Sequence, residues 1–202
     1  MTDLDAEDPK AVFELSERLY KEVMFSTDPV ATLSALVEEH NQSEAMQVRL
    51  RNALNHKSHH QLLPFVCVCY ASVSRPEKAP LLVALVRKLL EAGALPYGSG
   101  TSALAHVGGY NVEALGLLLD AAGGEFTELQ NRFRSHPDFV FDLSPELLQL
   151  MREKGVLPLE RREEDIPDPD DTGAEPVFED EREAAAYERN RKRREELIFG
   201  DG

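Results

Sequence analysis

The sequence has no tryptophan, only two cysteines and no apolar run long enough to cross a membrane. Cys67 and Cys69 lie in one apolar run, and a pair so close in sequence makes a poor disulfide framework for a secreted protein. The first residues are acidic and lack an apolar core, so we expect neither a signal peptide nor a transit peptide there. These absences predict a soluble, cytoplasmic protein, with nuclear or cytoskeletal residence left open.

Recognisable catalytic motifs are also missing. The glycine pairs at 108–109 and 123–124 lack the spacing of a phosphate-binding loop or a dinucleotide fingerprint. A cysteine and a distant histidine could in principle form a nucleophilic pair, but cysteines in an apolar run are usually buried and unreactive. Because function must be argued from a site, we expect no enzymatic activity and no cofactor.

A cluster of metal-binding residue types nevertheless stands near the middle of the chain. His56, His59 and His60 precede Cys67 and Cys69, and imidazole and thiolate are the usual ligands of zinc. On a helix the two cysteines would point about 200° apart, so they could not share one metal ion. We therefore expect no metal, with polar loop histidines and core cysteines, and keep a metal-dependent enzyme as the least favoured alternative.

Acidic residues dominate the charge. The net charge is −15, which argues against a general binder of nucleic acids or anionic membranes. From Glu160 onward there are 16 acidic and 8 basic residues, so the last fifth of the chain is a separate compositional zone. Its basic run Arg189–Arg194 could contact nucleic acid or act as a nuclear-import signal. Flanking Glu188, Glu195 and Glu196 favour a solvated helix with internal ion pairs.

Helical patterns fill the region before this zone. Helix-start signals stand at Asp8-Pro9, Asp28-Pro29 and Ser144-Pro145, each followed by apolar residues at helical spacing. The stretch Leu62–Tyr70 is rich in β-branched and aromatic residues that suit a strand, yet its apolar run is longer than most buried strands. We favour a buried helix there, with Pro64 in its first turn. The sequence thus predicts an all-α fold.

A similar helix end occurs three times. Leu89–Ala94 is followed after 29 residues by a related stretch at Leu118 and, after 32 more, by another at Leu150. Each has an apolar pair, one or more polar residues and a glycine able to adopt the left-handed conformation that ends a helix. A period of about 30 residues indicates a stacked-repeat protein, here a short α-solenoid of helical hairpins.

Two of these repeats resemble a known family. Val86–Ala94 with the following Leu-Pro-Tyr-Gly resembles the second helix and outgoing turn of an ankyrin repeat. Gly100–His106 resembles the opening of the next repeat, and Asn111–Leu119 resembles its second helix. The repeats are degenerate, and the best match covers Leu81–Gly124. The resemblance implies a stack whose concave face binds a protein.

The resemblance also implies which residues would line that face. The candidate protein-binding residues are Tyr97, Ser102, His106, Tyr110 and Asn111. The two tyrosines suit interface anchors because they offer a large rigid area with one polar end. Packing between adjacent repeats is an equally good explanation for them.

Taken together, the patterns predict three regions: a helical repeat domain over 1–159, an acidic, proline-rich linker over 160–178 and a charged helical tail over 179–202. The predicted function is a non-enzymatic interaction module, an adaptor or scaffold that binds a protein partner of unknown identity through the ankyrin-like stack while the acidic tail contacts a second surface. The alternative is a structural subunit of a large cytoskeletal or ribonucleoprotein assembly.

Overall fold

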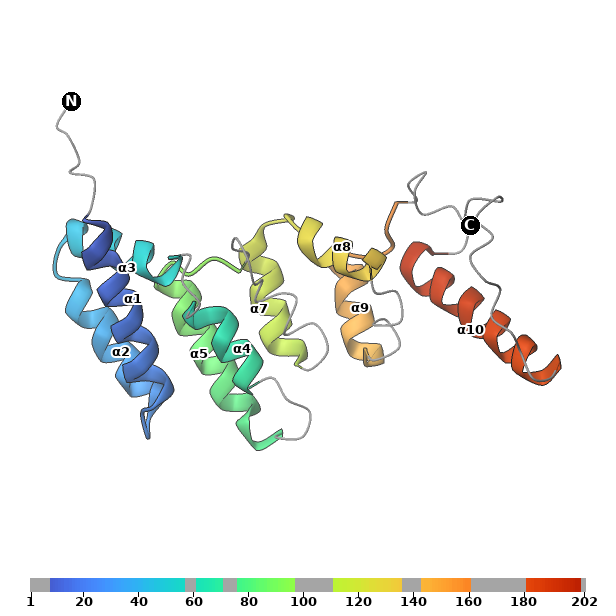
Figure 1. Ribbon diagram of the computed structural model, residues 1–202, viewed down its shortest axis with the longest axis horizontal. Helices are drawn as coiled ribbons and strands as arrows, with labels where there is room; N and C mark the ends of the chain where they lie inside the picture. The colour runs from blue at the N-terminus through green and yellow to red at the C-terminus, as the bar shows by residue number, and fades with distance from the viewer. Residues whose placement is uncertain are drawn as a thin grey trace, which may run out of the picture. The chain divides into compact units, whose positions relative to one another are not determined.

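A computed structural model describes the chain over residues 8–56, 61–70, 76–96, 111–135, 143–160 and 181–200 (Figure 1). All regular structure in these ranges is helical, which confirms the predicted all-α class. None of the described helices is both long enough and apolar enough to cross a bilayer. The chain divides into two compact units, Met1–Glu125 and Phe126–Gly202, so the terminal helix is grouped with the segment that begins at Phe126.

Unit 1 consists of helices packed on one another. Its elements are α1 (Pro9–Met24), α2 (Pro29–His40), α3 (Glu44–Leu54), α4 (Leu62–Tyr70), a short 3-10 turn (Pro76–Lys78), α5 (Ala79–Glu91) and α7 (Val112–Ala122). Helix α1 packs against α2, α3 and α4, while α5 packs against α2, α4 and α7. The most deeply buried side chains are aliphatic and include Leu19, Val23, Leu33, Leu82, Leu85, Leu89, Leu115 and Leu118.

Side-chain caps start the first three helices. Asp8 accepts a hydrogen bond from the Lys10 amide at 3.0 Å, and Asp28 accepts one from the Ala31 amide at 3.0 Å. Ser43 does the same at the start of α3. Because the first amides of a helix lack partners within it, each cap contributes about 1 kcal/mol. The starts at Asp8 and Asp28 were predicted from the sequence and are confirmed.

Glycines end the helices at the predicted places. Gly93, Gly123 and Gly155 have φ angles of 94°, 60° and 75°, which is the left-handed region. The backbone of Gly93 also lies close to the Arg51 side chain, because a Cβ atom added at Gly93 would be 3.1 Å from the Cγ atom of Arg51. The recurring helix end is therefore a conformational signal, and at Gly93 it also allows a close approach between helices.

Asn55 joins the ends of α3 and α5. Its Nδ2 atom donates to the carbonyls of Arg51 and Gly93, both at 2.8 Å. Its Oδ1 atom accepts a hydrogen bond from the Leu95 amide at 2.7 Å. One side-chain amide thus satisfies backbone groups on two segments that lie about 40 residues apart in the sequence.

The ambiguous apolar stretch is helix α4, as predicted. Leu62, Leu63, Val66 and Cys67 are buried, whereas Val68 is exposed. A helix this apolar needs cover on several sides, and it receives it from α5 and α1.

Unit 2 contains α8 (Thr127–Ser135), α9 (Pro145–Glu153) and α10 (Glu181–Phe199). Ser144 caps α9 by accepting from the Leu147 amide at 3.3 Å. The Gln130 side chain donates to the Val156 carbonyl and so ties α8 to the segment after α9. Among the described residues of this unit, the buried apolar side chains are those of Phe126, Leu129, Phe133, Leu143, Leu147, Met151, Val156, Leu157, Leu159 and Ile198.

Candidate protein-binding surface

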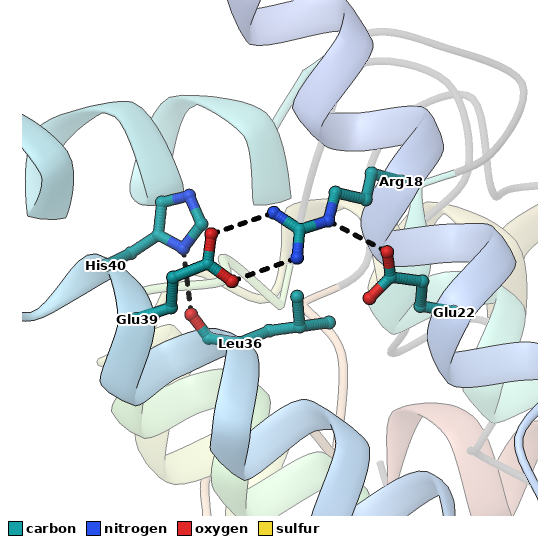
Figure 2. A network of polar contacts seen from close by, with 5 residues as sticks. All are labelled: Arg18, Glu22, Leu36, Glu39 and His40. Atoms are coloured by element: carbon teal, nitrogen blue, oxygen red, sulfur yellow. Dashed lines mark hydrogen bonds and ion pairs between the residues drawn. The ribbon is translucent and has the colours of Figure 1, made fainter.

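An ion-pair network joins α1 to α2 (Figure 2). The Arg18 guanidinium donates to both carboxylate oxygens of Glu39 at 2.9 Å, and its Nε atom donates to Glu22 at 2.8 Å. The hydrogen bonds to Glu39 and Glu22 raise the pKa of Arg18. The hydrogen bond from Arg18 lowers the pKa of Glu39. The bidentate pair joins α1 to α2 on the solvent-exposed surface, where an ion pair contributes little to stability.

Beside this network, His40 has a structural position. It is buried, and its Nδ1 atom lies 2.8 Å from the Leu36 carbonyl oxygen one turn earlier in α2 (Figure 2). A local side-chain contact of this kind satisfies a buried polar group within its own helix.

Aromatic side chains from α1 and α4 gather on one surface. The Tyr20 ring meets the Phe65 ring edge-on at 4.9 Å between centroids, and it meets the Phe25 ring edge-on at 6.3 Å. Val68 follows Phe65 by three residues and so lies on the same side of α4. We call Tyr20, Phe25, Phe65 and Val68 the aromatic face.

This face is exposed where an apolar surface would normally be covered. Phe25 is 77% exposed and Val68 is 52% exposed. A single exposed apolar residue needs no explanation, but an adjoining group of large ones marks a contact surface. The edge-on contacts place Phe25 and Phe65 on either side of one ring, that of Tyr20, so the three rings form one continuous group.

The two cysteines differ in access. Cys67 is buried in the core, and burial raises the pKa of its thiol, which makes it unreactive. Cys69 is partly exposed and follows Phe65 by four residues, so it borders the aromatic face. Cys69 therefore offers a chemical probe of that face.

A shallow depression of about 510 Å³ runs along α1. Its described lining is Phe13 together with the charged residues Glu14, Glu17, Arg18, Lys21 and Glu22. Phe13 also meets the His56 ring edge-on at 5.8 Å.

The predicted binding residues are placed only in part. Tyr97, Ser102, His106 and Tyr110 lie outside the described residues. Asn111 is described, and its Oδ1 atom accepts a hydrogen bond from the Ala114 amide at 2.8 Å, which caps α7. Its capping role explains its presence at this position, and its role in binding stays a prediction.

The histidine and cysteine cluster is likewise described in part. His59 and His60 lie outside the described residues, and His56 packs on Phe13 through its ring. In the ranges that the structure covers, no three histidine, cysteine or carboxylate side chains are grouped as metal ligands. The predicted absence of a metal stays a prediction because two members of the cluster are not described.

The basic run on α10 contains ion pairs of the expected kind. The Arg191 guanidinium lies 2.8 Å from the Glu188 carboxylate, and the Lys192 ammonium lies 3.9 Å from that of Glu196. These pairs connect neighbouring turns of one exposed helix, where each contributes about 0.3–0.5 kcal/mol to helix stability.

No family model matches this sequence, and no curated protein or solved structure is significantly similar to it. The resemblance to ankyrin repeats therefore remains a prediction based on the residues quoted above.

The aromatic face was not predicted from the sequence. Within Leu62–Tyr70 nearly every residue is apolar, so exposed and buried positions have the same chemical character. Phe25 stands just after the end of α1, where no periodic pattern assigns it to a face. Two features of the sequence could have indicated this face. Tyr20 and Phe25 are two aromatic residues close together in the sequence, and α4 has more apolar residues than one buried stripe of a helix needs.

Proposed function

We propose that this protein is a non-enzymatic protein-binding module and that the aromatic face of unit 1 is a surface to which its partner binds. The observation that carries the proposal is the exposure of Phe25, a large aromatic ring held against Tyr20 and left 77% open to solvent. Rings of this kind supply much of the binding energy at protein interfaces.

The arrangement favours binding at low entropic cost. Tyr20 is in ring contact with both Phe25 and Phe65, and these contacts within the chain reduce the side-chain entropy that a partner would have to remove. Covering Phe25 and Val68 would contribute about 2 kcal/mol for each side chain, at roughly 25 cal/mol per Å² of apolar area. This gain is large enough to anchor a specific contact.

The ankyrin-like stack is the second part of the proposal. If the helices pair as the resemblance implies, Tyr97, Ser102, His106, Tyr110 and Asn111 line a separate concave face. Two contact surfaces on one small domain suit an adaptor. A stable, stoichiometric assembly in which both faces stay covered would instead identify a structural subunit.

The test compares two exposed apolar residues of unit 1. Phe25→Asp places a charge on the aromatic face, whereas Val112→Asp places one at the start of α7, where Val112 is 40% exposed. Partners purified with the tagged full-length protein should be lost with Phe25→Asp and retained with Val112→Asp. Retention of the same partners by both variants would reject the aromatic face as the binding surface.

A further inference from the structure

The aromatic face continues along α1 beyond Tyr20. Phe13 precedes Tyr20 by seven residues in this helix, which is two turns, so both rings lie on the same side of α1 about 10 Å apart. Phe13 is 46% exposed, and its ring meets the His56 ring edge-on. We call Phe13, Tyr20 and Phe25 the aromatic row. Because Tyr20 contacts Phe25, the row is a line of rings that extends over about 18 Å.

Charged side chains border this row. The described lining of the depression along α1 contains Phe13, three carboxylates and two cations, so its net charge is −1. Both cations are already held in ion pairs. Arg18 binds Glu39 at 2.9 Å, and Lys21 lies 3.6 Å from Glu17. An excess of negative charge therefore lies beside the row, on a chain whose net charge is −15.

The row suits a helix better than an extended peptide. All regular structure in the described ranges is helical, so these ranges offer no strand edge to which an extended peptide could add. An extended peptide on an apolar surface would leave its own amides and carbonyls without partners, whereas a helix satisfies them internally. A helix also repeats its side chains every two turns, which is the spacing between Phe13 and Tyr20.

We propose that the aromatic row binds a basic amphipathic helix of a partner protein, which lies along α1 with its apolar side on the row. Basic side chains on the flank of that helix would face Glu14 and Glu17 in the depression. A second copy of this chain suits the site less well, because it would bring more negative charge to an acidic surface. This inference rests on the proposed function, since it names the kind of partner that covers the aromatic face.

The experiment measures the conformation of the bound segment by photo-crosslinking. Full-length protein with p-benzoylphenylalanine in place of Phe13, or in place of Phe25, is irradiated in cell extract. Mass spectrometry then locates the attachment point on the partner. Both positions should attach to one segment of one protein at residues about 12 apart, because a helix rises about 1.5 Å per residue over about 18 Å. That segment should carry a positive net charge.

The attachment points separate this inference from the proposed function. A spacing of about five or six residues would overturn the helix, because a strand of that length spans about 18 Å. Attachment to a segment without positive net charge, or to a second copy of this chain, would overturn the basic helix as the occupant. Attachment from the Phe25 position alone would overturn a helix along α1 and leave the proposed function intact. No attachment from either position would contradict the proposed function as well.

A third crosslinking position is the control for surface exposure. Val112 is an exposed apolar residue of unit 1 at the start of α7, outside the aromatic row. With p-benzoylphenylalanine in place of Val112, the protein should not attach to the segment found from Phe13 and Phe25. Attachment to that segment with equal yield would overturn its assignment to the row.

The charge of the flank is tested with the crosslinked segment made as a synthetic peptide, whose binding to full-length protein is measured by fluorescence anisotropy. Glu14→Lys should weaken binding at least about threefold at low salt, and less at 1 M salt, because exposed charges are screened. Glu113→Lys is the matched control and should leave binding unchanged. The side chains of Glu14 and Glu113 are 65% and 64% exposed, and each is paired with one cation. Equal binding by both variants would overturn the basic flank.

Discussion

Unit 1 and unit 2 differ in how their apolar side chains are divided between the core and the surface. Unit 1 has a surplus, because its helices fill the interior and still leave Phe25 and Val68 on the surface. In unit 2 the helices α8 and α9 have nine residues each, and Ile198 near the end of α10 adds to the buried apolar side chains that they supply. Apolar side chains left on the surface mark a possible contact surface, whereas a small core needs apolar side chains from a distant part of the chain.

The largest loss of stability should follow from removing a large side chain from the core of unit 2. Phe133 is buried in unit 2, and Phe133→Ala should cost about 3–5 kcal/mol through lost contacts and a cavity. Amide hydrogen exchange should show lost protection over 126–160 while residues 9–91 keep theirs. Equal loss over both regions would contradict the division into two units.

Gly93 tests the close approach within unit 1. Gly93→Ala should cost about 1–2 kcal/mol because an alanine at φ of 94° is strained and because its Cβ atom meets Arg51. Gly123→Ala is the control, since its φ is also positive but no atom lies within 4 Å of the added Cβ. Thermal denaturation should therefore show a larger loss for Gly93, and equal losses would remove the role of the Arg51 contact.

The two cysteines should report the surface and the core separately. Cys69 is partly exposed, whereas Cys67 is buried with a raised thiol pKa. In folded protein the Cys69 thiol should react with maleimide at least about a hundredfold faster than the Cys67 thiol. Cys67 should react only as fast as the protein unfolds. Mass spectrometry of the labelled peptide distinguishes them through a Cys67→Ala variant, which should retain the fast reaction.

The smallest effect should come from the Arg18–Glu39 pair. The pKa of Glu39 is lowered in the folded protein by the hydrogen bond from Arg18, below the 4.5 of an unperturbed glutamate. The pair therefore stabilises the fold above that value, and this contribution is lost as the pH falls below it. In Glu39→Gln the free energy of unfolding should fall less steeply between pH 5 and pH 3, about the range of carboxylate titration. An unchanged slope would show that the pair adds no pH-dependent stability.

Much of the fold followed from local signals. The capping residues Asp8, Asp28 and Ser144 and the glycines at helix ends are each defined by a few neighbours, so their positions could be predicted from sequence. Helix α10, Glu181–Phe199, lies within the stretch 179–202 where the sequence predicts a charged helical tail.

What could not be predicted depends on contacts between distant residues. Asn55 bonds to Gly93 and Leu95, and Ile198 bonds to Leu159, with nothing in either local sequence to indicate a partner about 40 residues away. The aromatic face has the same origin, because Tyr20 and Phe65 meet only after α1 and α4 pack.

The central claim is that a partner covers the aromatic face, and Cys69 allows this to be measured directly. Its alkylation rate should be several-fold lower in cell extract than in purified protein, because a bound partner shields the thiol beside Phe65. Phe25→Asp should restore the fast rate in extract, and Val112→Asp should not. Equal rates for wild-type protein in extract and in purified form would contradict the claim.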